Sequence, residues 1–266
     1  MRYKQGVYNM YLKWQRKNFE DDIDFILFHQ QDDTPAWWRK PLFKQYPELN
    51  YEYCYKLTQQ DRFEYIRKKM SEIAENRKTE IDSAVKKFEQ NWSAISDRIN
   101  DIYTAVFCEN CEIILNDMQA LVGLNPVCPR DLSENSFSVY YKDSDRDVIE
   151  TVLHEITHFV WFYFWQKYFN DDYEEYDHPH LKWLVSEIVV ETIIRNSELI
   201  DLISSDTKYI AYSYFYGMEI NGEQLFDTMK KLFMKRKNMK DFMLTSYKYC
   251  KENEKELREK IQAAEN

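Results

Sequence analysis

The chain has 266 residues, 44% of them hydrophobic, so it is long enough to bury a substantial core as one domain with a helical N-terminal part. Its formal net charge of −10 argues against the backbone of nucleic acids as its main ligand. The N-terminus does not resemble a signal peptide and no apolar run approaches the roughly 18 residues of a membrane span, so we expect a cytoplasmic protein.

Residues 1–107 are predicted to form the helical N-terminal part, and residues 108–266 the remainder of the domain. Apolar residues recur at steps of mostly three and four within residues 63–106, which is a heptad-like stripe. A polar segment at residues 76–79 either divides this stripe into two helices or lies within one long helix. The stripe is typical of a packed helical layer, and a homodimer formed through it is the alternative.

The five cysteines are odd in number, which disfavours a complete set of disulfides within the chain. Cys108 and Cys111 form a single CxxC pair. Because a second pair is missing, free thiols are favoured over half of a structural zinc site or a redox site.

Three short segments are predicted as strands. Residues 112–115 and 120–122 are apolar runs, and residues 137–142 alternate in the manner of a half-buried strand. With only 4 glycines and 6 prolines the chain has too few turn formers for an all-β fold. We therefore expect an α+β protein that is predominantly helical and has a small mixed sheet.

The most informative segment is His154-Glu155-Ile156-Thr157-His158, an HExxH motif. Ser144 can cap a helix before it, and no glycine or proline falls between Ser144 and His178. Two histidines four residues apart share one helix face, so both imidazoles can reach one zinc ion at about 2.0–2.1 Å. Glu155 can then act as general base toward a water molecule on the metal. Two ordinary core histidines are the alternative interpretation.

A second helix is predicted over residues 179–196, with Pro179 in its first turn and Asp177 or His178 as its cap. Glu187 and Glu191 lie one turn apart in an apolar segment, where buried carboxylates require a cation. Glu187 is the preferred third ligand, and Glu191 is expected to accept the free ring N–H of a ligating histidine. Alternatively, both carboxylates pair with Lys or Arg on a solvated face.

The connection between the two helices holds the rivals for the third ligand, which are Asp177, His178 and His180. The acidic residues 171–175 before them are expected to be solvated, with a bias of the cleft toward basic substrates as the alternative. Beyond residue 196 further helices are expected, ending in a charged tail. Four tyrosines there are candidates to stabilise an oxyanion, and the sequence does not choose among Tyr209, Tyr212, Tyr214 and Tyr216.

The HExxH motif followed by Glu187 and Glu191 resembles the gluzincin group of zinc metallopeptidases, whose thermolysin-like members have a downstream Asn-Glu-x-x-x-Asp. Here Ser186 and Glu191 stand in the places of Asn and Asp. The resemblance implies a zincin-like catalytic part over residues 108–266, with His154, His158 and Glu187 as zinc ligands and Glu155 as base. It also implies that residues 137–142 form the cleft-edge strand to which a peptide adds. The metzincin pattern does not fit, because Trp161 and Phe164 occupy the positions of its glycine and third histidine.

We therefore expect a zinc-dependent metallopeptidase with one zinc ion per chain and a peptide or protein substrate. The alternative is a catalytically silent helical binding or scaffolding protein that retains a structural zinc ion or a vestigial motif. An open coordination position and an intact Glu155 favour the enzyme, whereas a metal held entirely by protein ligands, or none, favours the scaffold.

Overall fold

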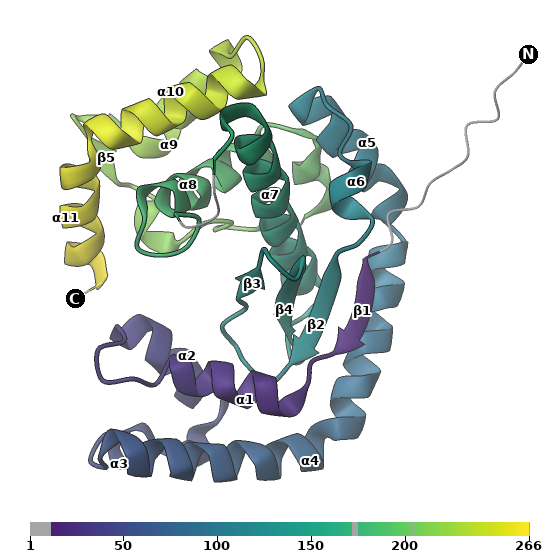
Figure 1. The fold of residues 1–266 in the computed structure, drawn as a ribbon, viewed down its shortest axis with the longest axis vertical. Coiled ribbons are helices and arrows are strands. Elements are labelled where there is room, and N and C mark those ends of the chain that lie inside the picture. The colour runs from purple at the N-terminus through teal and green to yellow at the C-terminus, as the bar shows by residue number, and fades with distance from the viewer. Residues whose placement is uncertain (1–11, 172–174, 204, 266) are drawn as a thin grey trace, which may run out of the picture. The chain divides into compact units, whose positions relative to one another are not determined.

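The computed structural model describes residues 12–171, 175–203 and 205–265 (Figure 1). These residues form two compact units. The sheet unit comprises Leu12–Ser93 and Met118–Thr151, and the helical unit comprises Ala94–Asp117 and the described part of Val152–Asn266. Both units combine segments from either side of the expected boundary at residue 107, because strands and helices that are distant in sequence pack together.

The sheet unit contains one mixed sheet of four strands in the order β1-β2-β4-β3. The strands are β1 (Lys13–Arg16), β2 (Gln119–Gly123), β3 (Arg130–Asp131) and β4 (Ser136–Tyr140). β1 pairs in parallel with β2 and β2 in parallel with β4, whereas β3 is antiparallel to β4. The expected small mixed sheet is thus present, and the expected strand at residues 120–122 is β2.

β4 differs from the half-buried cleft-edge strand expected at residues 137–142. All five of its residues are buried, and β3 lies on its outer side, with Arg130 opposite Phe137 and Asp131 opposite Ser136. A strand covered on both faces loses the alternation of exposed and buried side chains. The edge of the sheet next to β4 is therefore formed by β3.

The helices of the sheet unit are α1 (Phe19–Phe28), α2 (Ala36–Gln45), η1 (Pro47–Leu49), α3 (Tyr51–Cys54) and α4 (Gln59–Ser93). α4 runs beside α1 and β1 (Figure 1). It continues through residues 76–79 without a break, which selects the single long helix for this segment. Its apolar stripe, including Ile66, Met70 and Phe88, is buried within the single chain, as a packed helical layer requires.

Two local predictions are wrong. Residues 13–16 were expected to be helical but form the strand β1. Their hydrogen bonds to β2 outweigh the lack of alternating polar and apolar residues in this segment. Residues 112–115 form a helical turn, α6 (Glu112–Leu115), instead of a strand. The Asn110 side chain accepts a hydrogen bond of 2.8 Å from the Glu112 N–H, which favours helix initiation, and Ile113 is left exposed.

The helical unit consists almost entirely of helices. They are α5 (Ser96–Phe107), α6, most of α7 (Asp145–Phe169), α8 (Leu181–Arg195), η2 (Glu198–Leu202), η3 (Ser213–Phe215), α9 (Leu225–Lys235), α10 (Met239–Glu252) and α11 (Glu254–Glu265). A two-stranded hairpin of β5 (Glu219–Ile220) and β6 (Glu223–Gln224) precedes α9. α8 is central, since it packs against α9 and α10 and is buried from Trp183 to Ile194. Among the described residues, no helix is both long and apolar enough to span a membrane.

The cysteines carry free thiols, as expected. Cys108 is exposed at the end of α5, whereas Cys111 is buried, and burial raises the pKa of its thiol to about 12. Neither residue belongs to a cluster of metal-binding side chains within the described part of the chain.

Candidate metal centre

The HExxH motif lies in the middle of α7. Ser144 caps the helix as predicted, because its hydroxyl oxygen accepts a hydrogen bond of 3.2 Å from the Asp147 N–H. The helix ends at Phe169, although no glycine or proline follows before Pro179 to mark its end. Asn170 adopts a left-handed backbone with φ of 50°. Asparagine is the residue that most often replaces glycine at such a helix end, so Asn170 was the overlooked stop signal.

The two motif histidines meet on one face of α7. The Nε2 atoms of His154 and His158 are 3.0 Å apart, and their ring centroids are 4.7 Å apart. His158 is fully buried, whereas 17% of the His154 side chain is exposed. The spacing of four residues therefore brings two imidazole nitrogens together, as the sequence predicted.

The orientation of His154 is set by a backbone carbonyl from a distant segment. Its Nδ1 lies 2.9 Å from the carbonyl oxygen of Ile210. A carbonyl can only accept a hydrogen bond, so Nδ1 carries the proton and Nε2 of the neutral ring keeps its lone pair. Metal-binding histidines characteristically donate their second ring N–H in this way.

α8 supplies the third side chain. The carboxylate of Glu187 is 2% exposed, with Oε2 3.5 Å from His154 Nε2 and Oε1 3.4 Å from His158 Nε2. α8 begins at Leu181 with His180 at its N-cap, so Pro179 precedes the helix instead of occupying its first turn. Neither Asp177 nor His178 therefore occupies the expected cap position, but the register that faces Glu187 toward the histidines is the predicted one.

The donor set fits a zinc ion. Donor atoms of His154, His158 and Glu187 all lie within 4.8 Å of one another, and no other group of this kind occurs among the described residues. Tetrahedral zinc with ligands at about 2.0–2.1 Å separates its ligand atoms by roughly 3.3 Å, close to the distances between these nitrogen and oxygen atoms. Two imidazoles and one carboxylate form a donor set of catalytic zinc sites, in which a fourth position stays open.

No family model, curated protein or solved structure matches this chain. The resemblance to gluzincins therefore rests on the motif residues and on their spacing. The geometry of the site is independent of that resemblance, because it follows from the positions of the side chains.

Glu155 lies beside His154. Its side chain is buried, and its Oε1 is 3.9 Å from His154 Nε2. The carboxylate thus lies next to the nitrogen that would bind a metal, at a distance that exceeds direct hydrogen bonding. This placement suits a group that exchanges protons with a water molecule near the metal.

The rival ligands Asp177, His178 and His180 are not part of this cluster. All three are exposed, and the ring of His178 lies edge-on against Trp183 with the ring centroids 4.9 Å apart. Although His178 is exposed, the loss of some of its hydration lowers its pKa, and the positive charges of Arg258 and His180 lower it further. Residues 172–174 of the acidic run lie outside the described residues, so its role in substrate choice stays a prediction.

Glu191 has other partners than those expected. Ile210, and not Glu191, accepts the ring N–H of His154. The buried Glu191 carboxylate instead accepts hydrogen bonds from Arg195 Nε and, at 2.5 Å, from the Tyr216 hydroxyl. Pairing with an arginine was the alternative expectation for Glu191, but this expectation placed the pair on a solvated helix face, whereas Glu191 is buried.

The hydrogen bond from Tyr216 to Glu191 narrows the choice among the four tyrosines that could stabilise an oxyanion. Burial, and then the hydrogen bond to Glu191, raises the pKa of Tyr216 to about 12, so the phenol keeps its proton at neutral pH. That single proton is donated to Glu191. In this arrangement Tyr216 cannot also donate to an oxyanion, which leaves Tyr209, Tyr212 and Tyr214 as the candidates.

The sequence did not point to the contacts that hold α7 in the helical unit. The Tyr103 hydroxyl, on α5, is 3.1 Å from the Leu153 carbonyl and 2.7 Å from Thr157 Oγ1. Thr157, one of the variable motif positions, also donates to the Leu153 carbonyl. No sequence signal links Tyr103 to the motif, because they are separated by about fifty residues.

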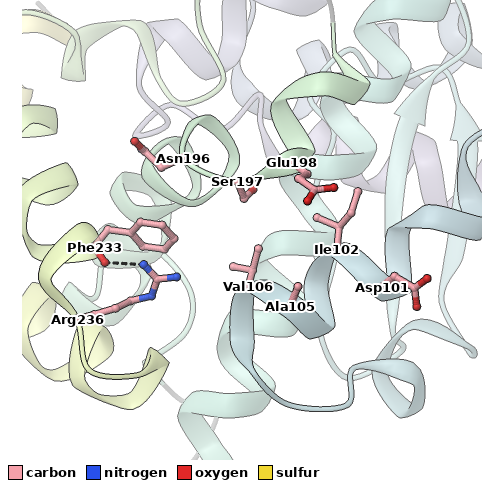
Figure 2. A pocket seen from close by; sticks show the side chains of 9 residues that line it. All are labelled: Asp101, Ile102, Ala105, Val106, Asn196, Ser197, Glu198, Phe233 and Arg236. Atoms are coloured by element: carbon pink, nitrogen blue, oxygen red, sulfur yellow. Dashed lines mark hydrogen bonds between the residues drawn. The ribbon is translucent and has the colours of Figure 1, made fainter.

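A separate hollow of about 440 Å³ lies elsewhere in the helical unit (Figure 2). Its lining includes Ile102, Ala105 and Val106 on α5, Glu198 on η2, and Phe233 and Arg236 at the end of α9. The Arg236 guanidinium lies over the Phe233 ring, 3.6 Å from its centroid, and donates to the Phe233 carbonyl. The predicted site residues do not line this hollow.

The third ligand can be tested by substitution. Glu187→Ala is expected to weaken zinc binding by more than the roughly 10–100-fold loss typical of a residue that only orients a ligand. His178→Ala and His180→Ala are the matched controls and should leave the affinity nearly unchanged. Zinc affinities are measured by competition with a chromophoric chelator. Equal affinity of the wild type and Glu187→Ala would transfer the role to the segment around His178 and His180.

Proposed function

We propose that this protein is a zinc-dependent metallopeptidase, with one zinc ion per chain held by His154, His158 and Glu187. The observation that carries the proposal is the position of the Glu155 carboxylate, which lies buried next to a set of three donor atoms that fits zinc. A purely structural site needs four protein ligands, whereas the described residues contribute three to this cluster. The choice of a peptide as substrate rests on the resemblance of the motif to gluzincins.

Each residue has a separate task in the proposed reaction. His154 and His158 would present neutral imidazole nitrogens to the ion, and the Glu187 carboxylate would supply one negative charge, which offsets half of the charge of a divalent ion. Bound zinc lowers the pKa of a water molecule to about 7 and polarises a carbonyl group. Glu155 accepts the proton of the attacking water at a carboxylate oxygen and returns it to the leaving amine nitrogen.

The proposal is tested first by removal and return of the metal. Protein loaded with one equivalent of zinc is expected to cleave members of a peptide library, and a chelator should reduce the rate to background because the nucleophilic water is lost. Adding back one equivalent of zinc should restore the rate. Cleavage that persists after chelation would contradict the proposal. Tight zinc binding without cleavage across the library would favour a scaffolding protein with a structural metal.

A cytoplasmic location belongs to the same proposal. The free thiols of all five cysteines agree with a reducing compartment.

A further inference from the structure

Three charged residues follow one another at intervals of one turn along α8. They are Glu187, Glu191 and Arg195, which share a helix face because they are four residues apart. Glu187 faces the two histidines, whereas Glu191 and Arg195 bind to each other. The helix that provides the third ligand therefore also carries a partly buried ion pair one and two turns further along.

This ion pair holds the segment of residues 207–211 at several points. The Arg195 Nη2 donates hydrogen bonds of 3.1 Å to the carbonyls of both Thr207 and Lys208. The Tyr216 hydroxyl donates to Glu191, and its oxygen accepts from the Ile210 N–H at 2.8 Å. The segment is thus attached to α8 through two side chains that share one carboxylate.

The peptide group between Ile210 and Ala211 is held at both ends. Its N–H, on Ala211, donates to the Tyr216 hydroxyl at 3.3 Å. Its carbonyl, on Ile210, accepts the Nδ1–H of His154 at 2.9 Å. Because the peptide group is planar, fixing the N–H also fixes the direction of the carbonyl. The orientation of the His154 ring therefore depends on the position of the Tyr216 hydroxyl.

We propose that Tyr216 and Arg195 are positioning residues for the metal ligand His154, and that they act through Glu191 and the Ile210 carbonyl. The inference rests on the proposed function, since it assumes that zinc binds at His154. The arrangement links two ligands that lie on different helices. Glu187 belongs to α8, and the carbonyl that orients His154 of α7 is anchored one and two turns further along α8.

Tyr216→Phe removes the hydroxyl and retains the ring. We expect zinc affinity to fall by about 10–100-fold, as is typical when the residue behind a ligand is lost. Tyr209→Phe is the matched control, because Tyr209 is exposed, belongs to the same region of the chain and packs against the Tyr216 ring at 4.8 Å. Its zinc affinity should equal that of the wild type. Affinities are measured by chelator competition, together with the melting temperatures of the metal-free proteins.

A second readout separates positioning from general loss of structure. In the zinc-bound wild type the Nδ1–H proton of His154 should exchange slowly with water, because it is held by a carbonyl, and Tyr216→Phe should accelerate this exchange measured by NMR. If Tyr216→Phe does not fold, Arg195→Lys takes its place. It keeps the charge near Glu191 but not the planar fork that reaches three acceptors, and should also weaken zinc binding.

The outcomes are distinct. Weakened zinc binding with accelerated Nδ1–H exchange, and no such change in Tyr209→Phe, supports the inference. Wild-type affinity and exchange in folded Tyr216→Phe or Arg195→Lys overturn it and leave the proposed metallopeptidase intact. A wild type that binds no zinc overturns the proposed function, and the inference falls with it.

Discussion

Simultaneous replacement of His154 and His158 by alanine is expected to change the zinc content of the protein from about one ion per chain to none. The two imidazoles contribute two of the three donor atoms in the cluster. The remaining carboxylate of Glu187 is a single hard oxygen ligand and does not retain a zinc ion by itself. Zinc content is measured by elemental analysis after reconstitution and removal of free metal.

The control for this experiment is the double variant His178→Ala and His180→Ala. It removes the same number of histidines, but from exposed positions outside the cluster. This variant should retain one zinc ion per chain. Unchanged zinc in the His154 and His158 double variant, or equal loss from both double variants, would show that the cluster is not the metal site.

Glu155→Gln is expected to retain zinc and the fold but to lose peptide cleavage. Gln has nearly the same shape as Glu, so the buried side chain keeps its packing, whereas its amide cannot accept a proton at neutral pH. General-base catalysis typically contributes about 10²–10⁴-fold, which is the loss expected in kcat/KM. The rates of zinc-loaded wild type and variant are compared on the same library peptide.

Glu198→Gln provides a matched control, because it makes the same chemical change at an exposed residue of the helical unit. It should cleave at the wild-type rate. Equal melting temperatures and zinc contents of all three proteins are required before the rates are compared. Full activity in Glu155→Gln would show that the cleavage comes from a contaminant or from another site.

Several features of the site followed from sequence alone because they depend on local helix geometry. A spacing of four residues places His154 beside His158, whatever surrounds the helix. The cap at Ser144 is likewise local, since its hydroxyl reaches an N–H only three residues ahead. Glu187 was predicted on weaker grounds, namely that a carboxylate in an apolar helix needs a cation, and the structure brings it to the histidines.

The small sheet shows where local patterns fail. Residues 112–115 have the apolar composition of a strand but lack a neighbouring strand, and they form a helical turn. Residues 13–16 have few of the sequence features of a strand, but they form a strand because β2 provides hydrogen-bond partners. Strand formation depends on the partner, which is more than a hundred residues away in the case of Lys13 and Gln119.

The surroundings of His154 were decided only by the tertiary structure. The sequence predicted that a carboxylate, Glu191, would accept the ring N–H of a ligating histidine, but the N–H of His154 is accepted by a backbone carbonyl 56 residues away. Any residue has a carbonyl, so no side-chain pattern marks Ile210 for this role. The sequence by itself thus determined which side chains of α7 and α8 share a helix face, because four residues make about one turn. Which distant backbone segment meets that face was decided by the return of the chain through residues 207–216, where Arg195, Glu191 and Tyr216 hold it.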